Sequence, residues 1–284
     1  MRKTDRFLTR KGSVVEYSIA GQGEPILIMH GGHSNCKEEF GYRELAGQGY
    51  CIITPSRPGY GSTSKELGEN ALTACEAYLE LLDFLKVPRV HVIAISAGGP
   101  SGIHFASRYP KRVRSLTLQS AVTHRWLTVD DTFYKSAQVM FRPSIEKGVW
   151  LLIRSMNKIF SDVLFKSMIP AFSNLGKDEL LLQFNDDDKR QFGNMLNRQR
   201  SGHGFMIDLV QTSQNLESEL SLIQCPALIM HSKNDGLVAV KHAYYAQQYI
   251  PNSELIILDT WGHLIWMGKD AADMHAKLFE FLKG

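Results

Sequence analysis

The chain of 284 residues is 44% hydrophobic and 21% charged, with 32 lysines and arginines against 29 aspartates and glutamates. A chain of this length can bury a substantial core without cross-links, and its composition excludes the disordered and fibrous classes. The net charge of +3 is small and its basic residues are scattered, so we expect no nucleic-acid partner.

The basic amino terminus, MRKTDRFLTRKGSV, lacks the apolar stretch of a secretory signal, and no run reaches the roughly 18 to 20 apolar residues of a membrane span. The cysteines Cys36, Cys51, Cys75 and Cys225 are far apart and form no CxxC pair, which favours reduced structural thiols over a zinc or redox site. We therefore expect a soluble, cytoplasmic protein.

Short apolar runs recur along the chain, as buried strands of a parallel sheet do. The apolar runs are residues 13–19, 25–30, 51–55, 90–95, 114–121, 225–232 and 254–259. The first of these runs has only mixed strand character. Between two of them, residues 71–87 repeat leucine and alanine every three or four positions, which indicates a helix. Strands that alternate with helices predict an α/β fold with a doubly wound, mostly parallel sheet.

The alternation stops between Thr123 and Ile223, where 144–160 and 186–200 are helical in pattern and no strand is evident. We predict an all-helical cap inserted after the sixth core strand. The predicted domains are the core at 1–122 and 223–284 and the cap at 123–222. Most of the cap's many phenylalanines and methionines should form its own core, and the others could line a hydrophobic pocket.

Ligands of α/β sheets bind at the carboxyl ends of the strands, so the residues directly after each run are candidates for the site. These positions hold Gly31-Gly32-His33, Arg57-Pro58-Gly59-Tyr60-Gly61, Ser96-Ala97-Gly98-Gly99, Asp235, and Trp261-Gly262-His263. The glycines after Arg57 match neither spacing of a nucleotide-binding loop, so we interpret that segment as a structural turn.

A serine, an acid and a histidine, in that order after three different strands, resemble the α/β-hydrolase fold family and its serine-nucleophile, esterase-like and lipase-like branch. The resemblance covers nearly the whole chain. It implies that Ser96 is the nucleophile, Asp235 the acid and His263 the base. It also implies an oxyanion hole made by the backbone amides of Gly32 and Ala97.

The stretch around Ser96 gives a steric reason for this role. A serine hydroxyl needs a base and an exposed position, and a sharp strand-to-helix turn supplies that exposure. The turn is crowded, so positions 94 and 98 must be small. Gly98 fits, and Ala94 stands where the family usually has glycine. The alternative role, a helix N-cap alone, explains a serine before a helix but not its small neighbours.

Other residues at strand ends compete for parts of the site. His30 and His231 are expected to be structural, and Asp259, four residues before His263, is an alternative acid. Gly31 and His33 are alternatives to Gly32 as the second oxyanion donor. His33 could also face the substrate pocket, as could Trp261.

The predicted function is hydrolysis of a carboxylic ester of a fairly hydrophobic small molecule through an acyl-enzyme on Ser96, with no metal or organic cofactor. Alternatives within the family are an aminopeptidase or amidase similar to proline iminopeptidases and a hydrolase of carbon–carbon bonds. A receptor for small molecules that retains the triad is an alternative of another class.

Overall fold

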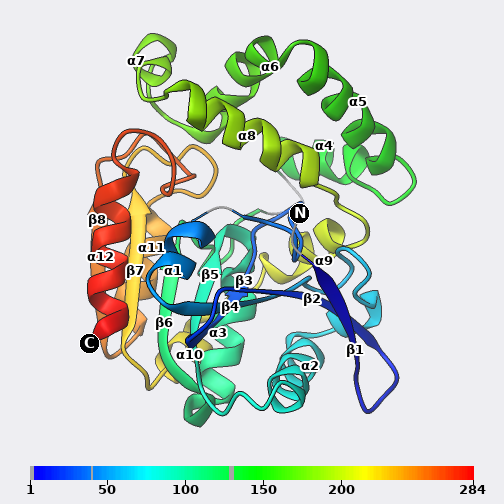
Figure 1. Ribbon diagram of the computed structural model, residues 1–284, viewed down its shortest axis with the longest axis vertical. Coiled ribbons are helices and arrows are strands. Elements are labelled where there is room, and N and C mark those ends of the chain that lie inside the picture. Colours follow the sequence, from blue (N-terminus) through cyan, green and yellow to red (C-terminus); the bar gives the residue numbers. More distant parts are fainter. Residues whose placement is uncertain (1–2, 40, 128–130) are drawn as a thin grey trace.

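The computed structural model describes residues 3–39, 41–127 and 131–284. Within these ranges eight strands form one sheet in the order β1-β2-β4-β3-β5-β6-β7-β8 (Figure 1). β1 pairs antiparallel with β2 and β2 with β4, and all later pairs are parallel. The strands are β1 (Thr4–Leu8), β2 (Val14–Ala20), β3 (Glu24–Met29), β4 (Tyr50–Pro55), β5 (Val90–Ile95), β6 (Val113–Gln119), β7 (Ala227–Ser232) and β8 (Ser253–Leu258).

The predicted α/β class is confirmed, and every predicted apolar run contains a strand. β1 was missed by the sequence analysis. Its residues TDRFL are only half-buried to exposed and mix charged with apolar side chains, because β1 is an edge strand that packs on one face only.

The sheet is covered on both faces, and successive residues of its inner strands point to opposite sides. On β3, Leu27 and Met29 join one core cluster and Ile26 and Ile28 join another. The first cluster includes side chains of α2 (Ala71–Phe84), α3 (Gly99–Arg108), α10 (Glu217–Ser221) and α11 (Lys241–Tyr249). The second includes side chains of α1 (Tyr42–Gly47) and α12 (Ala271–Lys283). These strands are therefore buried on both faces, which explains their continuous apolar sequences.

A separate helical layer follows β6 and lies at the top of Figure 1. It consists of α4 (Thr132–Met140), α5 (Glu146–Ile159), α6 (Ser161–Met168), α7 (Lys177–Leu181) and α8 (Asp186–Arg198). Its core contains Trp150, Phe165, Phe192 and Met195. We call these helices the helical layer.

The end of the predicted cap interval packs differently from the rest. α9 (Gly204–Gln211) follows the helical layer, and after it Leu216, Leu220 and Ile223 belong to the main core cluster beneath the sheet. α10 contacts α3 and α11, so its apolar face is buried against the core and not against the layer. The chain therefore leaves the helical layer and packs on the core of the sheet before residue 222, the predicted end of the cap.

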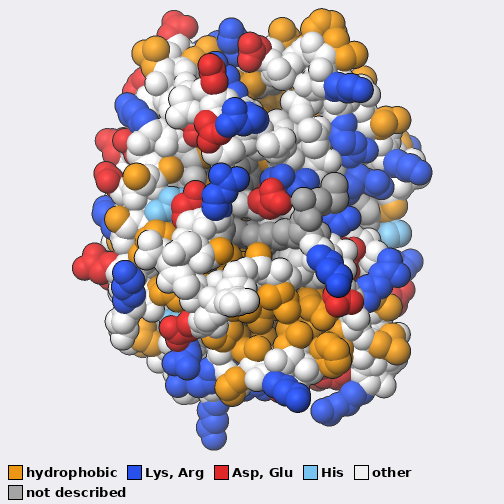
Figure 2. All heavy atoms as spheres, viewed as in Figure 1, with side chains coloured by type: hydrophobic (Ala, Val, Ile, Leu, Met, Phe, Trp, Pro, Cys, Tyr) orange, Lys and Arg blue, Asp and Glu red, His pale blue; other side chains and the backbone are white. Residues whose placement is uncertain are grey.

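Short 3-10 helices complete the described elements: η1 (Lys65–Gly68), η2 (Ser96–Gly98), η3 (Pro110–Arg112) and η4 (Ile169–Phe172). None of the helices in the described ranges combines the length and apolarity that crossing a membrane would require. Figure 2 shows basic and acidic side chains interspersed on the face in view.

Candidate active site

Ser96 occupies the turn between β5 and α3. Its φ of 51° lies in the left-handed region, which a residue with a side chain adopts rarely and at a cost. A Cβ at Gly98 would lie 2.3 Å from the carbonyl oxygen of Met29, so only glycine fits there. The chain thus holds Ser96 in a strained conformation at the carboxyl end of the sheet.

The methyl group of Ala94, the departure from the family's usual glycine, is accommodated by Gly102 on α3. Ala94 is fully buried, and a Cβ at Gly102 would lie 2.5 Å from the Ala94 Cβ. Real Cβ atoms do not approach so closely. The strand and the helix can therefore pack closely with a side chain at position 94 or at position 102, but not at both.

We expect Gly102→Ala to lower the free energy of unfolding by about 1–3 kcal/mol, because strand and helix must separate to admit the methyl group. Adding Ala94→Gly should restore most of the loss, since the glycine then lies on the strand. Urea unfolding of both single variants and the double variant measures this coupling. Losses that simply add in the double variant would contradict the assignment of this contact.

The structure brings Ser96, His263 and Asp235 together. His263 Nε2 lies 2.9 Å from Ser96 Oγ, and His263 Nδ1 lies 2.7 Å from Asp235 Oδ2. His263 and Asp235 are each 3% exposed. Because the carboxylate only accepts, Nδ1 carries the proton and Nε2 is free to accept the serine hydroxyl hydrogen. This arrangement can remove a proton from Ser96.

The carboxylate of Asp235 is fixed by four neighbours. Oδ1 accepts the amides of Leu237 and Val238 at 2.8 and 2.9 Å. Oδ2 lies 2.7 Å from His263 Nδ1 and 3.2 Å from His231 Nε2. Burial alone would raise the pKa of Asp235, but His263 and His231 hold this pKa well below its usual range. Asp235 therefore stays ionised and keeps His263 in one orientation.

Residues 172–174, between α6 and α7, bind the loops that carry Asp235 and His263. The carbonyl oxygen of Phe172 accepts the amides of His263 at 2.9 Å and Gly236 at 3.2 Å. Asn174 Nδ2 donates to the carbonyl oxygen of Asp235 at 2.9 Å. Nothing in the local pattern of a loop between helices indicates which distant loop it will bind, so this contact could not be predicted from the sequence.

The loop after β3 passes beside Ser96. A Cβ at Gly31 would lie 3.3 Å from the Ser96 Cβ, and one at Gly32 would lie 3.8 Å from the Ala97 Cβ. The amide of His33 already donates to the Tyr60 hydroxyl at 3.2 Å. Among the described residues, the structure gives the amides of Gly32 and Ala97 no acceptor. Of the predicted and alternative donors, His33 is thus occupied, while Gly32 and Ala97 are available; the amide of Gly31 likewise has no acceptor among the described residues and stays an alternative.

His33 lies beside this loop among aromatic rings. Its ring stacks on Phe205 at 4.0 Å between centroids, and its Nδ1 lies 2.8 Å from Ser201 Oγ. Trp150 Nε1 donates to the same oxygen at 2.8 Å. Burial lowers the pKa of His33 to about 3, against the opposing effect of Glu146. The ring is therefore neutral near pH 7.

Trp261 was the other residue expected to face the substrate pocket, but its side chain is buried in the core instead. Its side chain is 2% exposed, belongs to the core of the helical layer, and donates from Nε1 to the carbonyl oxygen of Met267 at 2.8 Å. The indole therefore has no surface to offer a ligand in this structure. Phe184 packs against the Trp261 ring, with 4.8 Å between the ring centroids.

The competing histidines and acid have other partners. His30 Nδ1 donates to the carbonyl oxygen of Gly31 at 2.8 Å, and His231 Nε2 donates to that of Val238 at 2.8 Å. Asp259 is exposed and pairs with Lys233 at 2.7 Å. Asp259 therefore faces away from the buried ring of His263.

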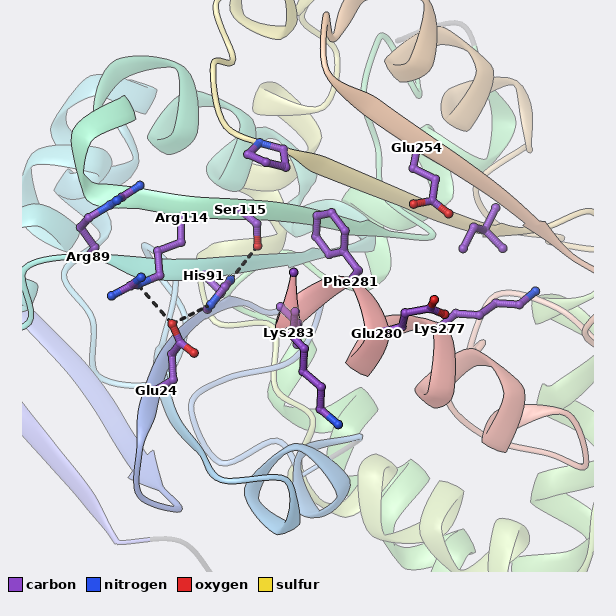
Figure 3. Close-up of a pocket in the computed structure, with 14 residues that line it drawn as sticks. Glu24, Arg89, His91, Arg114, Ser115, Glu254, Lys277, Glu280, Phe281 and Lys283 are labelled. Atoms are coloured by element: carbon purple, nitrogen blue, oxygen red, sulfur yellow. Dashed lines mark hydrogen bonds and ion pairs between the residues drawn. The ribbon is translucent and has the colours of Figure 1, made fainter.

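A large charged cavity of about 890 Å³ lies elsewhere, at the amino ends of the strands (Figure 3). There Glu24 pairs with His91 and with Arg114, each at 3.2 Å. Since strands rise about 3.3 Å per residue, His91 lies roughly 16 Å from Ser96 along β5. Within the described part of the chain, no His, Cys, Asp and Glu side chains are grouped so that they could hold a metal ion.

Comparisons with known proteins agree with this architecture. The family model for the alpha/beta hydrolase fold matches residues 24–142. The hydrolase YcgS of Bacillus subtilis, itself uncharacterized, is 53% identical over 283 residues, which is 100% of both chains. The chain therefore belongs to the α/β-hydrolase fold family, and its activity class is hydrolysis.

Two further similarities cover nearly the whole chain. The structure of an α/β hydrolase fold protein from Nakamurella multipartita matches with a TM-score of 0.83 and 27% identity, over 98% of each chain. A 2-hydroxy-6-oxo-6-phenylhexa-2,4-dienoate hydrolase of Burkholderia cepacia is 23% identical, over 93% of this chain and 89% of its own.

Proposed function

We propose that this protein is a serine hydrolase that cleaves a carboxylic ester of a hydrophobic small molecule through an acyl-enzyme on Ser96. The observation that carries the proposal is the continuous chain of hydrogen bonds from Ser96 Oγ through His263 to Asp235. Such a relay activates a hydroxyl that is otherwise a poor nucleophile.

The reaction follows from these positions. Ser96 Oγ attacks the ester carbonyl carbon while His263 Nε2 takes the hydroxyl proton. The tetrahedral oxyanion receives hydrogen bonds from the amides of Gly32 and Ala97. As the carbon–oxygen bond to the leaving group breaks, His263 returns the proton to the departing alcohol. A water molecule, deprotonated by His263, then attacks the acyl-enzyme and releases the acid, and Ser96 regains its proton.

The surroundings favour an uncharged, apolar substrate. Phe205 lies beside Gly32, and Phe172 lies beside His263 with 6.4 Å between ring centroids. The positive charge of Arg57, next to the oxyanion loop, is neutralised by Asp208. His33 is neutral near pH 7, so it offers no charge.

A panel of substrates tests this function. We expect turnover of p-nitrophenyl acetate, butyrate and octanoate, no turnover of aminoacyl anilides, and no activity in the Ser96→Ala variant. Release of nitrophenol or of aniline is followed by absorbance. Cleavage of the anilides alone would contradict the ester proposal and favour a peptidase.

Carbon–carbon bond hydrolysis is the second candidate, because the relative from Burkholderia cepacia is named for a hydroxy-oxo-dienoate substrate. The same panel should include 2-hydroxy-6-oxo-6-phenylhexa-2,4-dienoate. Turnover of this compound without turnover of the esters would replace the first candidate by the second. Inertness toward every compound, with no labelling of Ser96 by a fluorophosphonate, would contradict both.

A further inference from the structure

Arg57, in the turn after β4, is a buried cation with a buried partner on α9. Its Nη1 donates to Asp208 Oδ1 at 2.5 Å and its Nη2 donates to Asp208 Oδ2 at 2.7 Å. Each side chain is 1% exposed. Burial alone would lower the pKa of Arg57, but Asp208 raises it above its ordinary value. A fully buried ion pair of this kind adds little net stability, so a role in geometry is the better explanation for it.

The remaining donors of Arg57 reach the loop beside Ser96. Nε donates to the carbonyl oxygen of His30 at 2.6 Å, and Nη2 donates to that of Gly31 at 3.2 Å. On the other side of Gly32, the amide of His33 donates to the Tyr60 hydroxyl at 3.2 Å. This hydroxyl in turn donates to Asp208 Oδ2 at 2.6 Å. Asp208 is therefore the common anchor for both flanks of Gly32.

The Gly31 carbonyl and the Gly32 amide belong to the same peptide group. In a trans peptide the C=O and N–H bonds point in opposite directions. The Gly31 carbonyl accepts from Arg57 Nη2 at 3.2 Å and from His30 Nδ1 at 2.8 Å, and this hold turns the Gly32 N–H away from Arg57. Ser96 borders the same peptide, since a Cβ at Gly31 would lie 3.3 Å from the Ser96 Cβ.

The peptide between Gly31 and Gly32 needs such a hold. Neither residue has a side chain to restrict rotation, so the two glycines allow the peptide to turn over. A turned peptide would present the carbonyl oxygen to the developing negative charge, where it would repel the oxyanion.

We propose that Asp208 is a positioning residue that acts through Arg57 and Tyr60 to aim the Gly32 amide at the oxyanion. The proposal rests on the proposed serine hydrolase function. Asp208 and Arg57 do not touch the substrate; they fix the direction of a donor that does. The contact also makes the oxyanion hole depend on the placement of α9, which leads from the helical layer to the core.

Arg57→Lys tests the proposal, because lysine keeps the charge but its three donors on one nitrogen cannot replace the four bonds that Arg57 makes from three nitrogens. We expect kcat for p-nitrophenyl acetate to fall by about 10- to 100-fold, with KM within about threefold, as for loss of a transition-state donor. The inhibition constant of phenylboronic acid, which forms an anionic tetrahedral adduct, should rise by the same factor as kcat falls. In nitrogen-15 spectra, the Gly32 amide proton should shift on addition of the boronic acid in the wild type and not in the variant.

Arg112→Lys is the matched control. Arg112 also binds an aspartate, Asp83 at 2.7 Å, and donates to two carbonyl groups, those of Val87 and Pro88, far from Ser96 in the fold. Its kcat should stay within about twofold of the wild type. If Arg57→Lys does not fold, Tyr60→Phe removes the hydroxyl alone and should lower kcat by about three- to tenfold.

Two results would overturn the inference while leaving the hydrolase intact: a folded Arg57→Lys variant with wild-type kcat, or a fall in kcat without weaker boronic acid binding. A wild-type protein whose ester turnover does not depend on Ser96 would instead refute the proposed function. The two failures are therefore distinguished by the Ser96→Ala variant measured in the same assay.

Discussion

Replacing Ser96 with alanine is expected to lower kcat for p-nitrophenyl esters by about 10⁴-fold or more, because no other hydroxyl among the described residues is bonded to the ring of His263. The fold should persist, since the side chain is lost at a partly exposed position. Initial rates, with circular dichroism to verify folding, measure the effect.

Ser107→Ala is the control for this substitution. Ser107 lies on α3, the helix that follows Ser96, and its hydroxyl donates to the carbonyl oxygen of His104 at 3.1 Å. Its kcat should match that of the wild type. Full activity in Ser96→Ala would show that the hydrolysis occurs at another site.

Replacing Asp235 with asparagine should lower kcat by about 10⁴-fold, because it changes which ring nitrogen of His263 carries the proton. The Oδ1 position accepts the amides of Leu237 and Val238, so the asparagine oxygen must stay there. Its NH₂ group then faces His263 Nδ1, which must become an acceptor. The proton moves to Nε2, and the ring can no longer take a proton from Ser96.

Asp259→Asn separates Asp235 from the alternative acid. Asp259 is exposed and pairs with Lys233, so its loss should change kcat by less than about twofold. Both variants should be compared by kcat at neutral pH and by thermal unfolding. A large loss in Asp259→Asn, with Asp235→Asn near wild type, would reverse the assignment of the acid.

Much of the fold could be predicted from the sequence because parallel strands buried on both faces are apolar throughout. The candidate triad was also predictable, since its residues follow strands directly and strand ends converge at one edge of the sheet. The pairing of Ser96, Asp235 and His263 as nucleophile, acid and base came from the resemblance to a family, since the order of the strands could not be predicted from the apolar runs.

Other features depended on contacts between distant segments. Asp208 lies in the middle of the mostly apolar helix α9, and its sequence gives no sign of a buried arginine 151 positions earlier. Trp261 stands beside Gly262 and His263, yet its ring turns into the core of the helical layer. Proximity in sequence to a site residue did not predict the direction of the side chain.

The close contact between Ala94 and Gly102 also restricts how this sequence can change over evolutionary time. A chain with glycine at 94 and alanine at 102 would fill the same space, but one substitution cannot connect the two states. The route through alanine at both positions meets a 2.5 Å approach, whereas the route through two glycines leaves only a small void. Relatives that differ at position 94 should therefore have acquired the extra glycine first.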